Sequence, residues 1–326
     1  MRTYLLAFGV LILSYTFSFA QEVRSFDGYN NHINNPEWGA TGTLLERFVL
    51  PAYADGISMP AGADRMNPRA ISNRLFSQES SILDTRNLSD FIWVFGQFID
   101  HDIILVEESH TEPIMISVPE GDPMFDPAGS GNVLIPMMRS LPAPGTGTDV
   151  NNPRTPANAI TAYIDGSAVY GSDDVRASWL RTYQDGKLKM SEDNQLPYNT
   201  LTGTFNSRLD ANAPGMANAN PFNDKLYVAG DVRANENLLL TAYHTLFVRE
   251  HNRMCDEINN ENPGWDDEQI YQHARRHVAG FIQNIVYREW LPAMGIYLED
   301  YTGYNPNINP GISDVFSAAA YRMGHT

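Results

Sequence analysis

Four polar side chains interrupt an otherwise apolar segment, F-G-Q-F-I-D-H-D-I-I: Gln97, Asp100, His101 and Asp102. Acids are rarely buried without a partner, because a carboxylate removed from water must be compensated. A histidine can carry a proton near neutral pH. On a helix, Gln97 and His101 share one face, and the two acids are each rotated about 100° from the histidine. The segment therefore predicts a site that His101 and Gln97 enter, with an acid on either side; a solvated helix face is the alternative.

A second stretch, T-A-Y-I-D-G-S at residues 161–167, offers oxygen atoms at alternating positions. These are the side chains of Thr161, Asp165 and Ser167 and the backbone carbonyl of Tyr163, which would project to one side of an extended loop. Calcium takes six to eight such oxygens. An ordinary polar turn is the alternative, unless another part of the chain supplies a further carboxylate.

Two charged residues, Arg233 and Glu236, stand three apart where a helix is expected to start, and they could share a face. A surface ion pair is the alternative. Further along, His244 and His251 lie on a helix that packs, and we interpret both as structural. His273 and His277 have helical spacing and could bind a transition metal; a half-exposed pair without a ligand is the alternative.

Helices must position these residues. Apolar spacing near 3.6 residues predicts them over 89–106, with Ser89 as N-cap, over 235–259, over 265–290, and from 313 to the chain end. Pro263 and Gly264 separate the second from the third. Residues 112–158 and 190–225 are rich in turn formers and predict loops with short extended pieces. The fold class is therefore mainly α.

Composition excludes several classes of protein. The formal net charge of −17 over 326 residues argues against nucleic acid and anionic membrane surfaces as partners. The single cysteine, Cys255, permits no intrachain disulfide. Residues 1–20 predict a secretory signal peptide, with a membrane anchor as the alternative, and residues 21–60 predict an extended N-terminal arm. We expect a secreted protein with no membrane contact after signal cleavage.

The combination of G-Q-F-I-D-H-D, A-G-D-V-R-A-N-E and R-M-G-H-T resembles the animal haem peroxidase family of the peroxidase–cyclooxygenase superfamily. Within it, R-S-F-D-G-Y-N-N and N-P-E-W-G-A are similar to the peroxinectin-like secreted branch. The resemblance runs from about Arg24 to Thr326. It implies a helical domain with long loops and few short strands over residues 61–326. Because family domains continue beyond R-M-G-H-T, the resemblance also implies a domain incomplete at its C-terminus, and we expect a fragment of a longer gene product.

The resemblance assigns roles around a haem b group. His101 would be the distal histidine, Gln97 would line the same pocket, and Arg233 would be the distal arginine. Asp100 and Glu236 would form ester bonds to the haem.

The remaining assignments concern the other haem face and calcium. His325 would be the proximal iron ligand, and Arg322 would face a haem propionate. Asp102 would supply the missing carboxylate of a Ca²⁺ site, whose other ligands would be Thr161, Tyr163, Asp165 and Ser167. Asn237 stands where some members have a methionine linked to the haem, so that link is not expected.

The implied function is a secreted haem peroxidase that reduces hydrogen peroxide and oxidises halide, thiocyanate or phenolic donors. A fatty-acid dioxygenase of the same superfamily is one alternative. Its radical-forming tyrosine would stand three residues before the proximal histidine, where this chain has Arg322, with Tyr321 one residue earlier. A non-catalytic adhesion protein with the same fold is the other. The sequence leaves the electron donor and the oligomeric state open.

Overall fold

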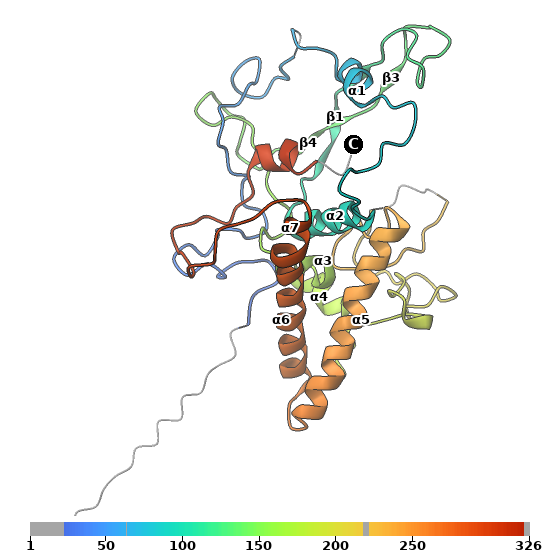
Figure 1. Ribbon diagram of the computed structural model, residues 1–326. Helices are drawn as coiled ribbons and strands as arrows, with labels where there is room; N and C mark the ends of the chain where they lie inside the picture. Colours follow the sequence, from blue (N-terminus) through green and yellow to red (C-terminus); the bar gives the residue numbers. More distant parts are fainter. Residues whose placement is uncertain (1–22, 63, 218–221, 323–326) are drawn as a thin grey trace, which may run out of the picture.

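Helices dominate the computed structural model, which describes residues 23–62, 64–217 and 222–322 (Figure 1). The helical elements are α1 (Pro68–Phe76), α2 (Phe91–Ile103), α3 (Ser167–Tyr170), α4 (Asp174–Leu180), the 3₁₀ turn η1 (Glu192–Asn194), α5 (Leu238–Glu261), α6 (Asp267–Ile285), the π-helical turn η2 (Val286–Trp290), α7 (Leu291–Ala293) and the π-helical turn η3 (Phe316–Ala320). The strands are β1 (Glu108–Pro113), β2 (Ile116–Ser117), β3 (Leu134–Ile135) and β4 (Met138–Ser140). Antiparallel pairing joins β1 to β4 and β2 to β3. The prediction of a mainly α chain with long loops and few short strands is confirmed.

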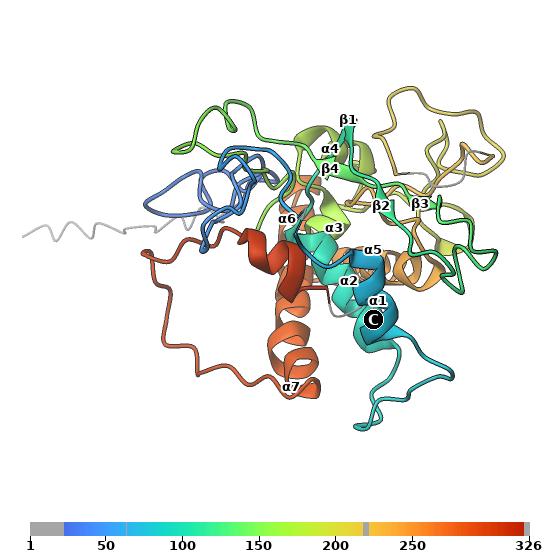
Figure 2. The same ribbon diagram turned by 90° about the horizontal axis from the view of Figure 1, so that it is seen from above.

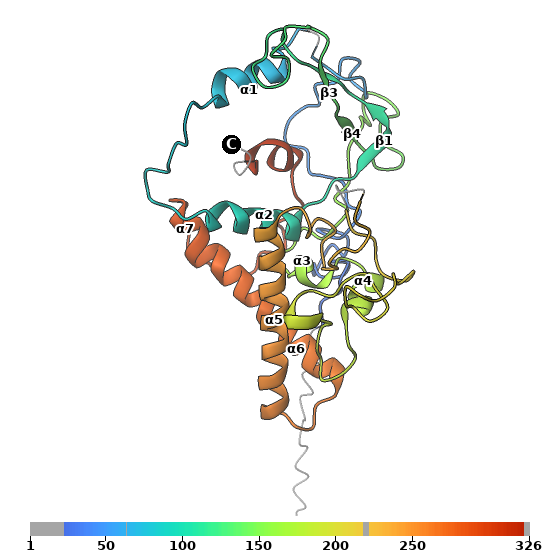
Figure 3. The same ribbon diagram turned by 90° about the vertical axis from the view of Figure 1, so that its right-hand side faces the viewer.

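Helices α5 and α6 form a long hairpin (Figures 1 and 3). Asn237 caps α5 by accepting a hydrogen bond from Leu240 N, and Asp266 caps α6 through a capping box with Gln269. The predicted helices over 235–259 and 265–290 are confirmed, and their exact starts follow from these caps. The second continues from α6 into the π-helical turn η2.

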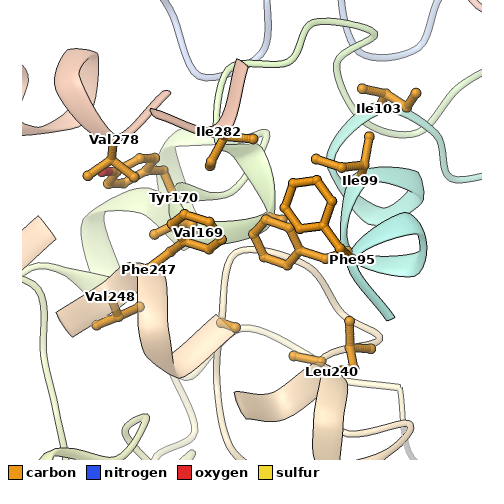
Figure 4. Close-up of a cluster of buried hydrophobic side chains, with 14 of the residues drawn as sticks. Phe95, Ile99, Ile103, Val169, Tyr170, Leu240, Phe247, Val248, Val278 and Ile282 are labelled. Atoms are coloured by element: carbon orange, nitrogen blue, oxygen red, sulfur yellow. The ribbon is translucent and has the colours of Figure 1, made fainter. Parts of the chain in front are cut away.

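Helix α2 lies across one end of this hairpin and packs against α3 and α5 (Figures 2 and 3). Its apolar side chains meet side chains of α3, α5 and α6 in the main core (Figure 4). The Phe98 ring is fully buried and stacks on Phe247 with 5.0 Å between ring centroids. Burial of one such ring contributes about 1.5–3 kcal/mol. The Trp290 indole donates to Ile92 O at 2.8 Å, which ties η2 to the first turn of α2.

The short strands and α1 lie on the opposite side of α2 from the α5–α6 hairpin (Figures 1 and 3). Residues 23–62 contain no helix in the part of the chain that is described, and their backbone joins distant segments. Leu45 N donates to Pro156 O and Glu46 N donates to Ile312 O. The division into an arm over 21–60 and a domain over 61–326 stays a prediction.

Two expected helical segments differ from the structure. Arg233 and Glu236 precede α5 in a turn, closed by a bond from Glu236 N to Arg233 O, so they are not on a helix. The helix expected from Ser313 onward is, among the described residues, one short turn around η3. The expected signal segment lies outside the described residues. Within those residues, no helix has both the length and the hydrophobicity needed to cross a bilayer.

Candidate active site

His101 lies near the C-terminal end of α2 and is 3% exposed. Its Nδ1 atom is 3.5 Å from Asp231 Oδ1, and among the described residues it makes no hydrogen bond. Burial, and then the nearby Arg233 guanidinium, hold the pKa of His101 well below its ordinary value. A proton on Nδ1 would face the Asp231 carboxylate, so Nε2 would keep a free lone pair. His101 therefore has the properties of a neutral base.

Arg233 is fixed by bonds to backbone and carboxylate oxygens. Its Nε and Nη2 atoms donate to the two Asp231 oxygens at 2.9 and 2.8 Å, and Nη2 also donates to Ile104 O at 2.9 Å. Nη1 lies 3.4 Å from Asp100 Oδ2. The guanidinium thus carries its charge beside His101 with little freedom to move, as stabilisation of a developing negative charge requires.

Asp231 is the residue that sequence reasoning missed. It is 3% exposed, accepts a bond from Arg233 N at 2.8 Å, and stands between the guanidinium and the His101 ring. Burial is the strongest influence and raises its pKa, but Arg233 and His101 outweigh it and hold the pKa at about 2. The signal was present in G-D-V-R, where an acid two residues before the arginine can accept both its backbone and side-chain donors.

The predicted ester-forming acids lie on the same side of α2. Asp100 Oδ2 lies 3.4 Å from Arg233 Nη1, and Asp100 Oδ1 lies 3.5 Å from Arg322 Nη1. Arg322 Nε also donates a hydrogen bond to Ser317 O. Glu236 accepts a bond from Gln97 Nε2 at 2.6 Å, and burial raises its pKa. The structure places Asp100 beside Arg233 and Arg322, and it pairs Glu236 with Gln97 rather than with Arg233.

The expected calcium ligands come together around Asp102 of α2. Asp102 is fully buried and accepts bonds from Ala168 N at 2.8 Å and Gly166 N at 3.2 Å. Ser167 Oγ donates to Asp102 O at 2.6 Å. Asp165 accepts a bond from Thr161 Oγ1 at 3.1 Å.

The negative charges of Asp102 and Asp165 would repel each other. Burial raises the pKa of both Asp102 and Asp165, and for Asp102 the neighbouring Asp165 charge adds to the effect. A cation would relieve this cost, so the donor set fits a hard divalent ion. Tyr163 lies in the same bend, with its hydroxyl donating to Trp38 O at 2.6 Å.

The residues present also fit one face of a haem. A buried neutral imidazole suits the space above an iron atom, and the guanidinium of Arg322 suits a propionate. His325, expected on the opposite face, lies outside the described residues.

The helical scaffold that carries this His–Arg–Asp arrangement has the fold of the peroxidase–cyclooxygenase class. The chain belongs to the animal haem peroxidase family, whose model matches residues 23–326.

Individual relatives agree with this assignment. Human dual oxidase 1 is 37% identical over 303 residues, which cover 92% of this chain and 19% of that protein. The chain thus spans about a fifth of the curated relatives it matches. Peroxidase A from Dictyostelium discoideum has a TM-score of 0.80 at 31% identity, covering 94% of this chain and 60% of that one. An Arabidopsis thaliana fatty acid alpha-dioxygenase shares the fold, with a TM-score of 0.63 at 22% identity, covering 83% of this chain and 37% of that one. The narrower likeness to peroxinectin-like members stays a prediction.

Proposed function

We propose that the chain forms the peroxide-reacting side of a secreted haem peroxidase that oxidises halide, thiocyanate or phenolic donors. The observation that carries the proposal is the neutral buried imidazole of His101 beside the fixed charge of Arg233. The haem, when bound, supplies an iron centre that accepts peroxide and stores its oxidising equivalents.

Three side chains have separate roles in the proposed reaction. His101 would take a proton from one oxygen of the peroxide and return it to the departing oxygen. Arg233 stabilises the negative charge on that oxygen. Asp231 is a positioning residue: it holds Arg233 through two bonds and faces His101 Nδ1, which leaves Nε2 toward the reacting oxygen.

The test of this proposal is hemin titration followed by a turnover assay. We expect a Soret band that saturates with hemin and peroxide-dependent oxidation of guaiacol or bromide. Peroxidase A from Dictyostelium discoideum, of which this chain covers 60%, is the positive control in the same assay. A chain that binds no hemin, or a haem-loaded chain without turnover, would contradict the proposal.

Covalent attachment of the haem gives one prediction. We propose that Asp100 and Glu236 would form esters to haem methyl groups, with peroxide as the oxidant that removes a methyl hydrogen, because Asp100 contacts Arg233 and Glu236 contacts Gln97. After peroxide treatment, haem should resist extraction into acidified butanone, and Asp100→Asn or Glu236→Gln should each increase the extracted fraction. Glu112→Gln, which removes a carboxylate bound to Arg154, is the control and should change nothing. Complete extraction from the unsubstituted protein would show that no ester forms.

Calcium removal gives another prediction. We propose that Asp102, Thr161, Tyr163, Asp165 and Ser167 hold Ca²⁺, because a cation would offset the charges of a buried acid and a half-buried one. Chelation by EGTA should lower Tm, since bound Ca²⁺ at roughly 100 times its Kd stabilises by about 2.7 kcal/mol.

Substitutions separate this effect from general destabilisation. Asp102→Asn should abolish the response of Tm to Ca²⁺. Asp126→Asn should keep it, because Asp126 is also buried, at 3% exposure, but its partners are its near neighbours Ser130 and Gly131 rather than the expected calcium ligands. If the Tm of the unsubstituted protein did not change with Ca²⁺, the proposed calcium site would be refuted.

A fatty-acid dioxygenase is the second candidate, since proteins of that activity share the fold. Arg322 occupies the position expected for the radical-forming tyrosine and contacts Asp100, while the Tyr321 hydroxyl donates to Gly96 O at 3.1 Å. Both contacts favour the peroxidase. Oxygen uptake with linoleate, without peroxidase turnover, would reverse this order. An adhesion role would instead require cell binding by haem-free protein.

A further inference from the structure

An exposed pair of imidazoles lies on α6, away from the candidate active site. His273 is half-buried and His277 is exposed, and their Nε2 atoms are 3.1 Å apart. Both belong to the first three turns of α6, next to its connection with α5, whereas α2 lies at the other end of the hairpin (Figures 1 and 3). The pair therefore has no part in the peroxide chemistry proposed above.

The separation of the two nitrogens fits a shared metal ion. Zinc–imidazole bonds are about 2.0–2.1 Å long, so two of them at angles between a right angle and a tetrahedral angle place the nitrogens about 2.9–3.4 Å apart. The observed 3.1 Å lies inside this range. The helix supplies the spacing, since residues four apart project from one face.

The hydrogen bonds of the pair determine which ring nitrogens are free to bind a metal. Without a metal, Arg276 Nη2 donates to His273 Nδ1 at 2.9 Å. His273 Nε2 then carries the proton and donates to His277 Nε2.

Metal binding must displace this hydrogen bond. Nε2 of His273 can offer a lone pair only if its proton moves to Nδ1, and Arg276 must then withdraw, because it can only donate. Arg276 is exposed, so it can turn into solvent. Arg276 therefore competes with the metal through both its hydrogen bond and its charge.

The site would have two protein ligands. The described residues contain no group of three or more His, Cys, Asp or Glu able to hold a metal, so water would complete the coordination. The charge of Glu261 at the end of α5 acts on His273 and would favour a cation. Imidazole ligands suit copper, nickel and zinc, and affinity rises toward copper.

We propose that His273 and His277 form a surface site for a divalent transition-metal ion that binds Cu²⁺ more tightly than Ni²⁺ or Zn²⁺. The untagged, haem-loaded chain, kept in excess Ca²⁺, should bind one Cu²⁺ in calorimetric titration, with nitrogen hyperfine splitting in its electron paramagnetic resonance spectrum. His273→Ala and His277→Ala should each weaken binding by at least about tenfold. Arg276→Gln should tighten it several-fold, an effect that a merely structural pair would not produce.

His110→Ala is the matched control, because His110 is a single exposed imidazole on β1. It should leave Cu²⁺ affinity unchanged, and the Soret band should be the same in all variants. Equal Cu²⁺ affinity in the unsubstituted protein and in His277→Ala would overturn the proposal. An Arg276→Gln variant that binds no tighter would overturn the competition by Arg276.

Discussion

Replacement of His101 by alanine is expected to lower the rate of peroxide-dependent oxidation by roughly 10²–10⁴, the usual contribution of a positioned acid–base group. The ring is buried, neutral and next to Arg233, so the chain would lose the group that moves the peroxide proton. The measurement is kcat and KM for guaiacol or bromide oxidation by haem-loaded protein. Cyanide association with the ferric haem is a second readout, because binding of HCN also requires a base.

A control on the same helix separates chemistry from packing. Ile103→Val trims a buried side chain of α2 without touching a polar group, and such a change costs about 0.5–1.5 kcal/mol. It should lower Tm slightly and leave turnover and cyanide association near those of the unsubstituted protein. If His101→Ala kept full turnover, His101 would not be the distal base.

Asp231→Asn is expected to destabilise the protein by about 3 kcal/mol, because it leaves the charge of Arg233 partly uncompensated in a half-buried position. The loss should fall at the lower end of the range for broken buried pairs, since Asp100 remains 3.4 Å from Arg233. Denaturant unfolding measures this loss. The variant should also slow the reactions with peroxide and cyanide more than it changes KM for the reductant, because Asp231 faces His101.

Arg69 and Asp122 offer a control pair with the same geometry elsewhere. Its arginine is 15% exposed and its aspartate side chain 0%, against 15% and 1% for Arg233 and Asp231. Asp122→Asn should also lower stability, by a smaller amount, while the rates of peroxide and cyanide reaction stay unchanged. If both variants slowed these reactions equally, Asp231 would have only a structural role.

The sequence was informative where local pattern determined the structure. The apolar period predicts α2, α5 and α6, and the two acids within α2 are buried. The starts of α5 and α6 depend on the local caps Asn237 and Asp266, which the apolar period alone does not indicate.

The site was predictable only in part. Asp231 escaped notice because its role depends on a turn that brings it beneath a helix 130 residues earlier in the chain, a long-range contact without a periodic signal. The same turn kept Arg233 and Glu236 off the helix, since the cap at Asn237 starts α5 after them. The pairing of Gln97 with Glu236 is likewise a tertiary contact. The roles of the site residues stay predictions.

Three consecutive residues of α2, Asp100, His101 and Asp102, face three different surroundings: two arginines, the Asp231 carboxylate, and the bend around Asp165. One inserted or deleted residue just before them would rotate all three by about 100° and give each the neighbours of another. A single substitution in this stretch therefore changes one of these three contacts, whereas a change of length changes all of them. Homologues or designed variants that gain or lose residues should do so in the loops on either side of α2.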